Sequence, residues 1–344
     1  MNIAVLAGLS DEKLTSKLVS LTNCSEVNSV YLIRREPLVL ENIISIHPPY
    51  ILQKSKILSE LFRVLNLFII LCQNKVDAVV GVHLCWHGVW AVHLARLFRT
   101  KSVLLLTEDP RKYENKSFLN KCIQSFDWAL TRGESSKLFL EDTLGVKQVK
   151  VLPNVFIFSS HSDRTNIKYD IVFTGSLTKN KNVGFIIEIV KILSKKIPSL
   201  KVAIVGTGPE EGVLKEVVNN YQLNNVINFL GHMPSPSEVM SSSKIFLMAS
   251  KSEGLPMVLI EAMDQGLPCV APNIGDIKDV IRHGENGYLI EGDDINEYVE
   301  KCERLLSDEE LYKELAGGAI TFKTKKSNEY SLGYATSVWG SVLR

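Results

Sequence analysis

The sequence predicts an α/β protein built from two doubly wound, parallel sheets. Short apolar segments alternate with segments of helical periodicity along the whole chain, which is the pattern of βαβ units. At 344 residues the chain has room for two domains of ordinary size. Its content of 45% hydrophobic and 22% charged residues is that of an ordinary globular protein. Glycine turns follow several apolar segments, where ligands of such sheets bind.

The expected strands fall into two sets of six, separated near the middle of the chain. The first set is 2–7, 29–33, 42–46, 77–82, 102–106 and 128–131. The second set is 170–174, 201–205, 226–229, 244–248, 268–271 and 288–290. Helical periodicity between strands is clearest at 183–196, 210–221, 256–265 and 295–306.

The domain boundary is expected at Pro153-Asn154-Val155, so that the domains span 1–155 and 156–327, with a polar linker at 158–168. Residues 1–153 carry 19 basic and 14 acidic side chains, a balance of +5, whereas the rest carries 20 and 24, a balance of −4. The two halves therefore favour different partners. The basic half suits an anionic acceptor or membrane surface, but it is too weakly basic to indicate nucleic acid.

The cysteines and the first residues indicate a cytoplasmic protein. Six cysteines are scattered without a C-x-x-C pair, at 24, 72, 85, 122, 269 and 302, which favours reduced thiols. The start MNIAVLAG lacks the basic segment of a signal peptide and is typical of a first strand.

The segment 57–72 is strongly apolar and has Lys54, Lys56 and Arg63 in or beside it. Its continuous apolar run is too short to cross a membrane. Two interpretations are open. One is a helix that belongs to the core or lines a cleft, and the other is an interfacial helix that contacts lipid, since basic and apolar residues occur together.

The segment 252–263 (SEGLPMVLIEAM) is the most informative motif. Pro256 suits the first turn of a helix, so Glu253 is expected in the loop before it and Glu261 about a turn and a half inside it. Both carboxylates then face one cleft, beside helix N–H groups that attract an anion. Hydroxyl-binding carboxylates next to a diphosphate-sized site suit a nucleotide sugar. The alternative is a capped surface helix with two solvated glutamates.

This motif resembles the E-x(7)-E motif of retaining glycosyltransferases with the GT-B fold, family 4, the glycosyl transferases group 1 type. The resemblance covers about 150–320 and continues through segments in the family's order: 171–177 with 179–182, 204–209, 226–232, 266–271 and 284–289. It implies two Rossmann-like domains facing across a cleft. The first domain would bind the acceptor and the second the nucleotide-sugar donor, with a terminal helix, 328–344, packing back on the first.

The resemblance also implies roles for residues of the second domain. Glu261 matches the residue that bonds the ribose hydroxyls, and Glu253 the one that holds the donor sugar. Lys181 is the candidate that neutralises the diphosphate, and with Glu253 it forms the expected catalytic pair. The complete expected donor site is Gly175, Ser176, Lys181, Gly206, Gly208, His232, Met233, Glu253, Gly254, Leu255, Pro256 and Glu261.

The chain departs from the family at several positions. An arginine usually stands where this chain has Ser176, and Lys179 is the expected source of the missing charge. The family's Gly-Gly turn is Gly8-Leu9-Ser10 here, its Pro-Asn-Gly is Pro153-Asn154-Val155, and its histidine after the fifth strand is replaced by Glu108 or Asp109. The expected acceptor-side residues are Gly8, His87, Glu108 and Asp109. His83 is expected to be a core histidine.

A site without metal or cofactor is expected. No Asp-x-Asp follows a strand, and Asp293-Asp294 is typical of a helix N-cap. Lysine and helix dipoles would then balance the leaving diphosphate.

The resemblance implies retaining transfer from a nucleoside-diphosphate sugar to a hydroxyl acceptor, a glycan or a lipid-linked sugar. The setting would be bacterial surface polysaccharide or lipid-linked oligosaccharide synthesis, in the cytoplasm or at the inner face of the membrane with peripheral contact through the first domain. One alternative is a GT-B nucleotide-sugar epimerase or a synthase with a soluble acceptor. Another is a non-catalytic scaffold of a partner glycosyltransferase, suggested by Ser176, Glu108 and Val155. Sugar, base and acceptor stay open, because pocket shape sets them.

Overall fold

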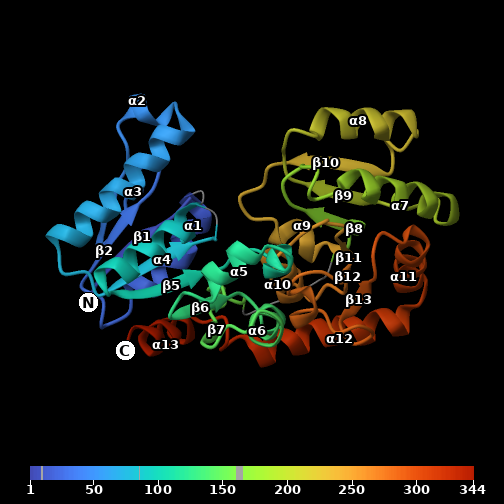
Figure 1. Cartoon of the computed structure of the whole chain (residues 1–344). Helices are drawn as coiled ribbons and strands as arrows, with labels where there is room; N and C mark the ends of the chain where they lie inside the picture. The colour runs from blue at the N-terminus through green and yellow to red at the C-terminus, as the bar shows by residue number, and fades with distance from the viewer. Residues whose placement is uncertain (9–10, 85, 160–165) are drawn as a thin grey trace. The chain divides into compact units, whose positions relative to one another are not determined.

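The computed structural model describes residues 1–8, 11–84, 86–159 and 166–344 (Figure 1). Two compact units divide the chain: unit 1 is Met1–Ile157 with Asn328–Arg344, and unit 2 is Phe158–Ser327. Unit 1 extends two residues beyond the expected boundary because the Phe156 N–H donates to the Tyr330 carbonyl, 2.9 Å away. Leu9, Ser10, Cys85 and most of the expected linker lie outside the described residues.

Unit 1 contains a parallel sheet of seven strands in the order β3-β2-β1-β4-β5-β6-β7. The strands are β1 (Asn2–Leu6), β2 (Ser29–Ile33), β3 (Ile43–Ile46), β4 (Ala78–Val82), β5 (Lys101–Leu105), β6 (Trp128–Thr131) and β7 (Val149–Val151). The first six lie within a residue of the expected segments. β7 was not predicted because three residues are too short to show a period. The strand order reverses between β1 and β4, the kind of position where doubly wound sheets bind ligands.

The helices of unit 1 are α1 (Asp11–Thr22), α2 (Tyr50–Gln53), α3 (Lys56–Gln73), α4 (Trp86–Phe98), α5 (Ser117–Ile123), α6 (Glu134–Leu138) and α13 (Leu332–Leu343). Two short turns, η1 (Pro110–Tyr113) and η2 (Phe139–Thr143), complete the set. Throughout the part of the chain that the structure describes, no helix combines the length and apolarity needed to cross a membrane.

Helix α13 completes the core of unit 1, although some 170 residues of unit 2 precede it in the sequence. Figure 1 draws it in red beside the blue and green elements of this unit. Trp339 is fully buried, and its indole N–H donates to Ser20 Oγ of α1 at 3.2 Å. Ala335 and Val342 pack in the same core, which also contains β1, β2 and β4. The first 157 residues therefore do not make a complete core by themselves.

Unit 2 contains a parallel sheet of six strands in the order β10-β9-β8-β11-β12-β13. The strands are β8 (Tyr169–Thr174), β9 (Val202–Val205), β10 (Ile227–Gly231), β11 (Ser243–Leu247), β12 (Cys269–Pro272) and β13 (Gly287–Ile290). All lie within two residues of the expected segments. Here the strand order reverses between β8 and β11, which marks the expected ligand position of this sheet.

The helices of unit 2 are α7 (Val183–Lys196), α8 (Glu211–Asn220), α9 (Ser237–Ser241), α10 (Met257–Asp264), α11 (Ile295–Ser307) and α12 (Glu309–Lys326), with a short turn η3 (Ile277–Asp279). α7 has the expected bounds, and Asp294 caps α11 by accepting from the N–H groups of Asn296 and Glu297, as its sequence indicates. α12 has no counterpart among the expected helices, because its buried residues are only Leu315, Ala319 and Phe322.

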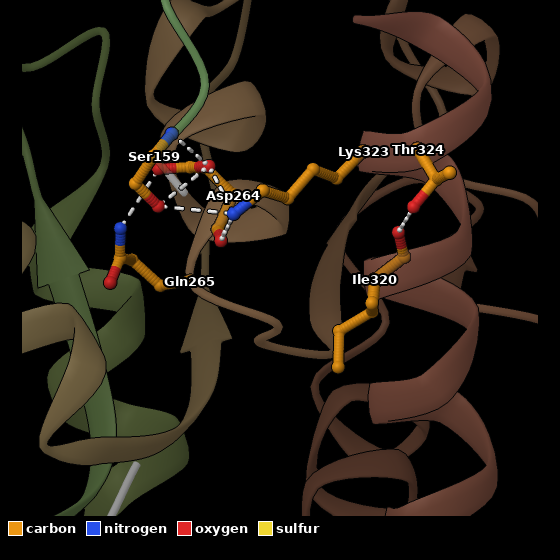
Figure 2. Close-up of polar contacts among 6 residues, drawn as sticks. All are labelled: Ser159, Asp264, Gln265, Ile320, Lys323 and Thr324. Atoms are coloured by element: carbon orange, nitrogen blue, oxygen red, sulfur yellow. Dashed lines mark hydrogen bonds and ion pairs between the residues drawn. The ribbon is translucent and has the colours of Figure 1, made fainter. Parts of the chain in front are cut away.

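A buried ionic cluster fastens both ends of unit 2 to α10 (Figure 2). Asp264 is 4% exposed and lies 2.9 Å from Lys323 Nζ of α12. It also accepts from the backbone N–H of Ser159 at 2.9 Å and from its hydroxyl at 3.1 Å. Removing one partner from such a buried pair typically costs about 3–5 kcal/mol. The cluster therefore fixes the end of the helix that starts at the glutamate motif.

Candidate functional site

The glycine turns of unit 2 bring four loops together at the carboxyl ends of β8, β9, β11 and β12. Gly206 has φ 130°, and a Cβ there would lie 1.9 Å from the carbonyl oxygen of Gly175. Gly275 has φ 55°, and a Cβ there would lie 2.1 Å from the carbonyl oxygen of Glu253. Gly208 lies similarly close to the Leu177 carbonyl, at 2.3 Å. Only glycine fits such contacts, so these turns are built for close backbone approach.

Lys181 and Glu253 form a direct ion pair at this edge of the sheet. The distance from Lys181 Nζ to Glu253 Oε1 is 2.7 Å, and the side chains are only 19% and 13% exposed. The stem of Lys181 lies over Gly175, with Cε 3.7 Å from the position of a Cβ there. The sequence predicted separate partners for these side chains, the diphosphate for the lysine and the sugar for the glutamate. In the structure they neutralise each other.

Hydrogen bonds join the loop of Lys181 to the loop of Glu253. The Asn180 side-chain amide donates to the Ser252 carbonyl at 2.9 Å, and the Lys251 N–H donates to the Asn180 carbonyl at 2.8 Å. The ion pair is therefore held by the backbone on both sides and is not a chance contact of two long surface side chains.

Helix α10 starts one residue later than predicted. Pro256 is its N-cap, with ψ 119°, and Met257 is the first helical residue. The extended conformation of Pro256 keeps it out of the first turn. Glu261 is then the fifth residue, a little over one turn inside the helix. Leu255 and Pro256 are buried, and the Gly254 carbonyl accepts from the Asp276 N–H at 3.0 Å. The first N–H groups of α10, which have no partner within the helix, therefore lie directly beside the Glu253 loop.

Two buried hydroxyls without partners lie at the same edge, and the sequence analysis missed both. Thr174 Oγ1 ends β8, and Ser250 Oγ follows β11, the neighbouring strand. Buried hydroxyls normally have a hydrogen-bond partner, so each one without a partner needs an explanation. A polar ligand that binds between β8 and β11 would satisfy them. The signal in the sequence is a polar residue at the end of an apolar strand or within three positions after it.

The remaining expected donor-site residues are exposed to solvent or half-buried. Ser176 and Lys179 are exposed in the turn after β8. His232 is exposed and Met233 half-buried in the turn after β10, which lies two strands from β8 in the sheet. Glu261 is half-buried on α10. They therefore follow the carboxyl ends of β8 and β10, apart from Glu261, which lies on α10.

In unit 1 a polar cluster lies at the carboxyl ends of β1 and β4. A Cβ at Gly8 would lie 2.5 Å from His87 Nε2, so the two expected acceptor-side residues are in contact. His87 Nδ1 lies 3.4 Å from Glu60 Oε2 on α3, without hydrogen-bond geometry. Arg63 pairs with Glu60 and donates to the Ala7 carbonyl at 2.9 Å. Glu60 was not predicted; its signal is the i, i+3 spacing to Arg63.

Glu108 lies beside His83, which is not the core histidine that the sequence predicts. The distance from His83 Nδ1 to Glu108 Oε2 is 3.4 Å, and the His83 backbone has φ 65°, a strained value for a non-glycine residue. Burial alone would raise the pKa of Glu108, but bonds from His83, Lys112 and Tyr113 outweigh it and lower the pKa to about 2. Glu108 is therefore an ionised carboxylate that orients His83, and it is too weak a base to take a proton.

Asp109 has a structural task. It is the N-cap of η1, accepts from the Arg111 backbone N–H at 3.0 Å and pairs with the Arg111 guanidinium at 2.9 Å. Of the two acids that stand where the family has a histidine, the geometry favours Glu108, since it holds a histidine beside it.

Arg132 is a buried cation that the sequence analysis missed. It directly follows β6 and is 4% exposed. Nη1 donates to the Leu152 carbonyl at 2.8 Å, whereas Nε and Nη2 have no partner. Burial lowers its pKa to about 9, so the guanidinium stays charged at neutral pH. It gives the carboxyl edge of this sheet a fixed positive charge. An arginine directly after an apolar strand was the available signal.

Known proteins resemble this chain over most of its length, and a family model matches the segment that forms most of unit 2. Residues 158–321 match the family described as glycosyl transferases group 1. An uncharacterized glycosyltransferase of Haemophilus influenzae is 32% identical over 174 residues, 50% of this chain. The amylovoran biosynthesis glycosyltransferase AmsD of Erwinia amylovora is 28% identical over 323 residues, covering 88% of this chain and 86% of AmsD. The chain spans only about half (48%) of the Haemophilus protein.

The fold has close counterparts among solved structures. HepE of Anabaena in complex with UDP has a TM-score of 0.77 at 16% identity, covering 100% of this chain and 99% of HepE. HepE has also been solved with UDP and glucose. The family match coincides with the unit that carries the Lys181–Glu253 pair and the glycine turns. The chain therefore has the GT-B fold, and its residues 158–321 match the glycosyl transferases group 1 family.

Proposed function

We propose that the protein is a retaining glycosyltransferase that moves a sugar from a UDP-sugar to a hydroxyl of an acceptor. The observation that carries the proposal is the Lys181–Glu253 pair. It lies at the carboxyl ends of the strands of unit 2, beside the start of α10. A cation, a carboxylate and free helix N–H groups are what a sugar diphosphate requires. UDP is the proposed leaving group because HepE, with the same fold, binds UDP.

In the proposed reaction, the bond from the sugar C1 to the phosphate oxygen breaks, and a bond from C1 to the acceptor oxygen forms on the same face. UDP leaves with the electron pair and takes up the acceptor's proton. Lys181 turns from Glu253 to the diphosphate, and with the N–H groups of α10 it stabilises the developing charge. Glu253, released from the lysine, binds the sugar hydroxyls, and Glu261 binds the ribose hydroxyls.

We assign donor binding to unit 2 and acceptor binding to unit 1, where His83, His87 and Arg132 are available. Bacterial surface-polysaccharide synthesis at the cytoplasmic side of the membrane is the proposed setting, in line with the role in the name of AmsD. A fixed cation such as Arg132 suits an acceptor that carries negative charge.

Thermal unfolding with a panel of nucleotide sugars tests the donor assignment. A UDP-sugar at 100 times its Kd should stabilise the protein by about 2.7 kcal/mol. Lys181→Gln should remove most of this stabilisation, because it removes the charge that meets the diphosphate. Lys244→Gln is the matched control: Lys244 is also paired, with Asp170 at 3.2 Å, but it lies at the opposite end of β11.

Product chemistry then separates the alternatives. Transfer to an acceptor or hydrolysis of the bound UDP-sugar supports the enzyme, and conversion into another UDP-sugar indicates an epimerase. Stabilisation without any turnover would leave only the scaffold. Stabilisation by GDP-, ADP- or CMP-sugars but not by UDP-sugars would contradict the proposed base.

Transfer should continue in the presence of EDTA. Over the described ranges, no group of three His, Cys, Asp or Glu side chains is arranged to hold a metal ion. In the pair of neighbouring acids Asp293-Asp294, Asp294 caps the N-terminus of α11. The charge of the diphosphate then has to be met by Lys181 and backbone N–H groups. Loss of turnover on chelation, with recovery on adding magnesium or manganese, would refute metal independence.

A further inference from the structure

Unit 1 contains an apolar groove between α3 and α4. The cavity has a volume of about 780 Å³, and a second one of about 540 Å³ adjoins it and shares Trp86 and Trp90 with it. The α3 side is lined by Ile57, Leu61, Leu65 and Phe68, and Phe118 of α5 lines the far cavity. Volumes of this size are typical of small-molecule and cofactor sites.

The lining of the groove is exposed although it is apolar. Leu61 is 61% exposed, Leu65 56% and Trp86 66%. Leu61 and Leu65 lie four residues apart on one side of α3, while Leu67 and Leu71 of the same helix are buried in the core. The interpretation of this segment as a core helix is confirmed for one face, whereas the other face is exposed, and contact with lipid stays a prediction. Contiguous exposed apolar surface of this kind marks a binding site.

One end of the groove reaches the acceptor-side cluster of unit 1. Glu60 lines the groove and also lies 3.4 Å from His87, which in turn contacts Gly8 at the end of β1. The negative charge of Glu60 is already matched by Arg63. The apolar groove is therefore continuous with the polar cluster at the carboxyl ends of β1 and β4, where an acceptor hydroxyl is expected.

The mouth of the groove near the start of α3 is basic. Lys56 lines the groove, and Lys54 is exposed two residues earlier. Lys54 precedes α3 and Lys56 is its first residue, so both lie beside the N–H groups of the first turn, which add positive potential. A ligand that complements this surface has a long hydrocarbon part and an anionic group close to it.

We infer that the groove between α3 and α4 binds the hydrocarbon chain of a lipid-phosphate acceptor, with its phosphate at Lys54 and Lys56 and its hydroxyl-bearing end toward His87. The inference rests on the proposed glycosyltransferase function and names the class of its acceptor. A single chain is favoured over a bilayer surface or a second copy of the protein, because the groove is concave, has helices on both sides and leads into the polar cluster.

The test measures the binding of geranylgeranyl phosphate below its micellar concentration. The change in fluorescence of Trp86 and Trp90 reports the binding. Leu65→Gln should weaken binding at least tenfold, because a polar amide then faces the chain. Leu97→Gln is the matched control, since Leu97 is a 67% exposed leucine of α4 outside the lining of both cavities. A double variant, Lys54→Gln with Lys56→Gln, should weaken binding of the phosphate but not of geranylgeraniol, and inorganic phosphate alone should bind poorly.

Several outcomes would overturn the inference. Equal affinity of wild type and Leu65→Gln for the lipid phosphate would remove the chain from the groove. Binding only to vesicles that contain phosphatidylglycerol, and not to the monomeric lipid, would make the groove a membrane surface. A dimer that Leu65→Gln dissociates, without lipid binding, would make it an interface between copies. Stabilisation by a UDP-sugar should be unchanged in Leu65→Gln, so a failure of donor binding in wild type would refute the proposed function separately.

Discussion

Replacing Glu253 by glutamine should lower kcat ten- to hundredfold without weakening the binding of bare UDP. Positive charge develops on the sugar ring only in the transition state, so a contact with the sugar that strengthens there acts on turnover. A hydrogen bond to a charged group is worth about 1.5–3 kcal/mol, which corresponds to this loss. Because Glu253 is paired with Lys181 at 2.7 Å, the variant also frees the lysine, which keeps UDP affinity intact or raises it.

The measurement compares kcat with the Kd of UDP in the same preparation. Glu261→Ala is the contrasting variant: it lies a turn inside α10, so it should weaken the binding of UDP through the ribose and leave the fold intact. Equal losses of kcat and UDP affinity in Glu253→Gln would place Glu253 on the nucleotide. Wild-type kcat would make it a solvated glutamate at a helix start. An unchanged Kd of UDP in Glu261→Ala would refute the ribose contact.

Trp339→Ala should destabilise unit 1 by about 3–5 kcal/mol. The side chain is fully buried in the core of unit 1, and its removal leaves a cavity and takes away the hydrogen bond that the Ser20 hydroxyl accepts. Chemical denaturation should show this as an earlier transition for unit 1. The transition of unit 2 should keep its midpoint and still respond to UDP, so the two units are followed separately.

Trp86→Ala is the control for this prediction, because Trp86 is a 66% exposed tryptophan of the same unit. It should leave the free energy of unfolding of unit 1 within about 0.5 kcal/mol of the wild-type value. A single transition that shifts by the same amount in both variants would contradict the independent core of unit 1.

Sequence periodicity was sufficient to locate both sheets and most of the site loops. Helix α7 has the expected bounds because its apolar spacing is long and regular, and the short strand β2 has them because its burial largely alternates. Lys181 was identified because it follows a strand and a glycine turn, and Glu253 because it is the first glutamate of the motif before a helix. Their direct contact was not predictable, since 72 positions separate them and no local rule relates the two loops.

Contacts between distant segments account for the other differences. His83 was expected in the core because it follows an apolar strand, but its left-handed backbone brings it to Glu108, 25 positions later. Glu60 and Arg132 were missed because charged residues in a helix or after a strand are usually solvated. The two faces of α3 could not be distinguished either, because both are apolar and only packing decides which one is buried.

Helix α13 has a consequence for the order in which the protein folds on the ribosome. Unit 2 is one continuous segment, Phe158–Ser327, whereas unit 1 needs Trp339 and its neighbours, which are translated only after unit 2. Unit 2 can therefore fold while the apolar surface of the first 157 residues is still uncovered. The nascent chain exposes that surface for the whole time needed to make unit 2, so biosynthesis of this protein should depend on chaperones more than the stability of the finished molecule suggests.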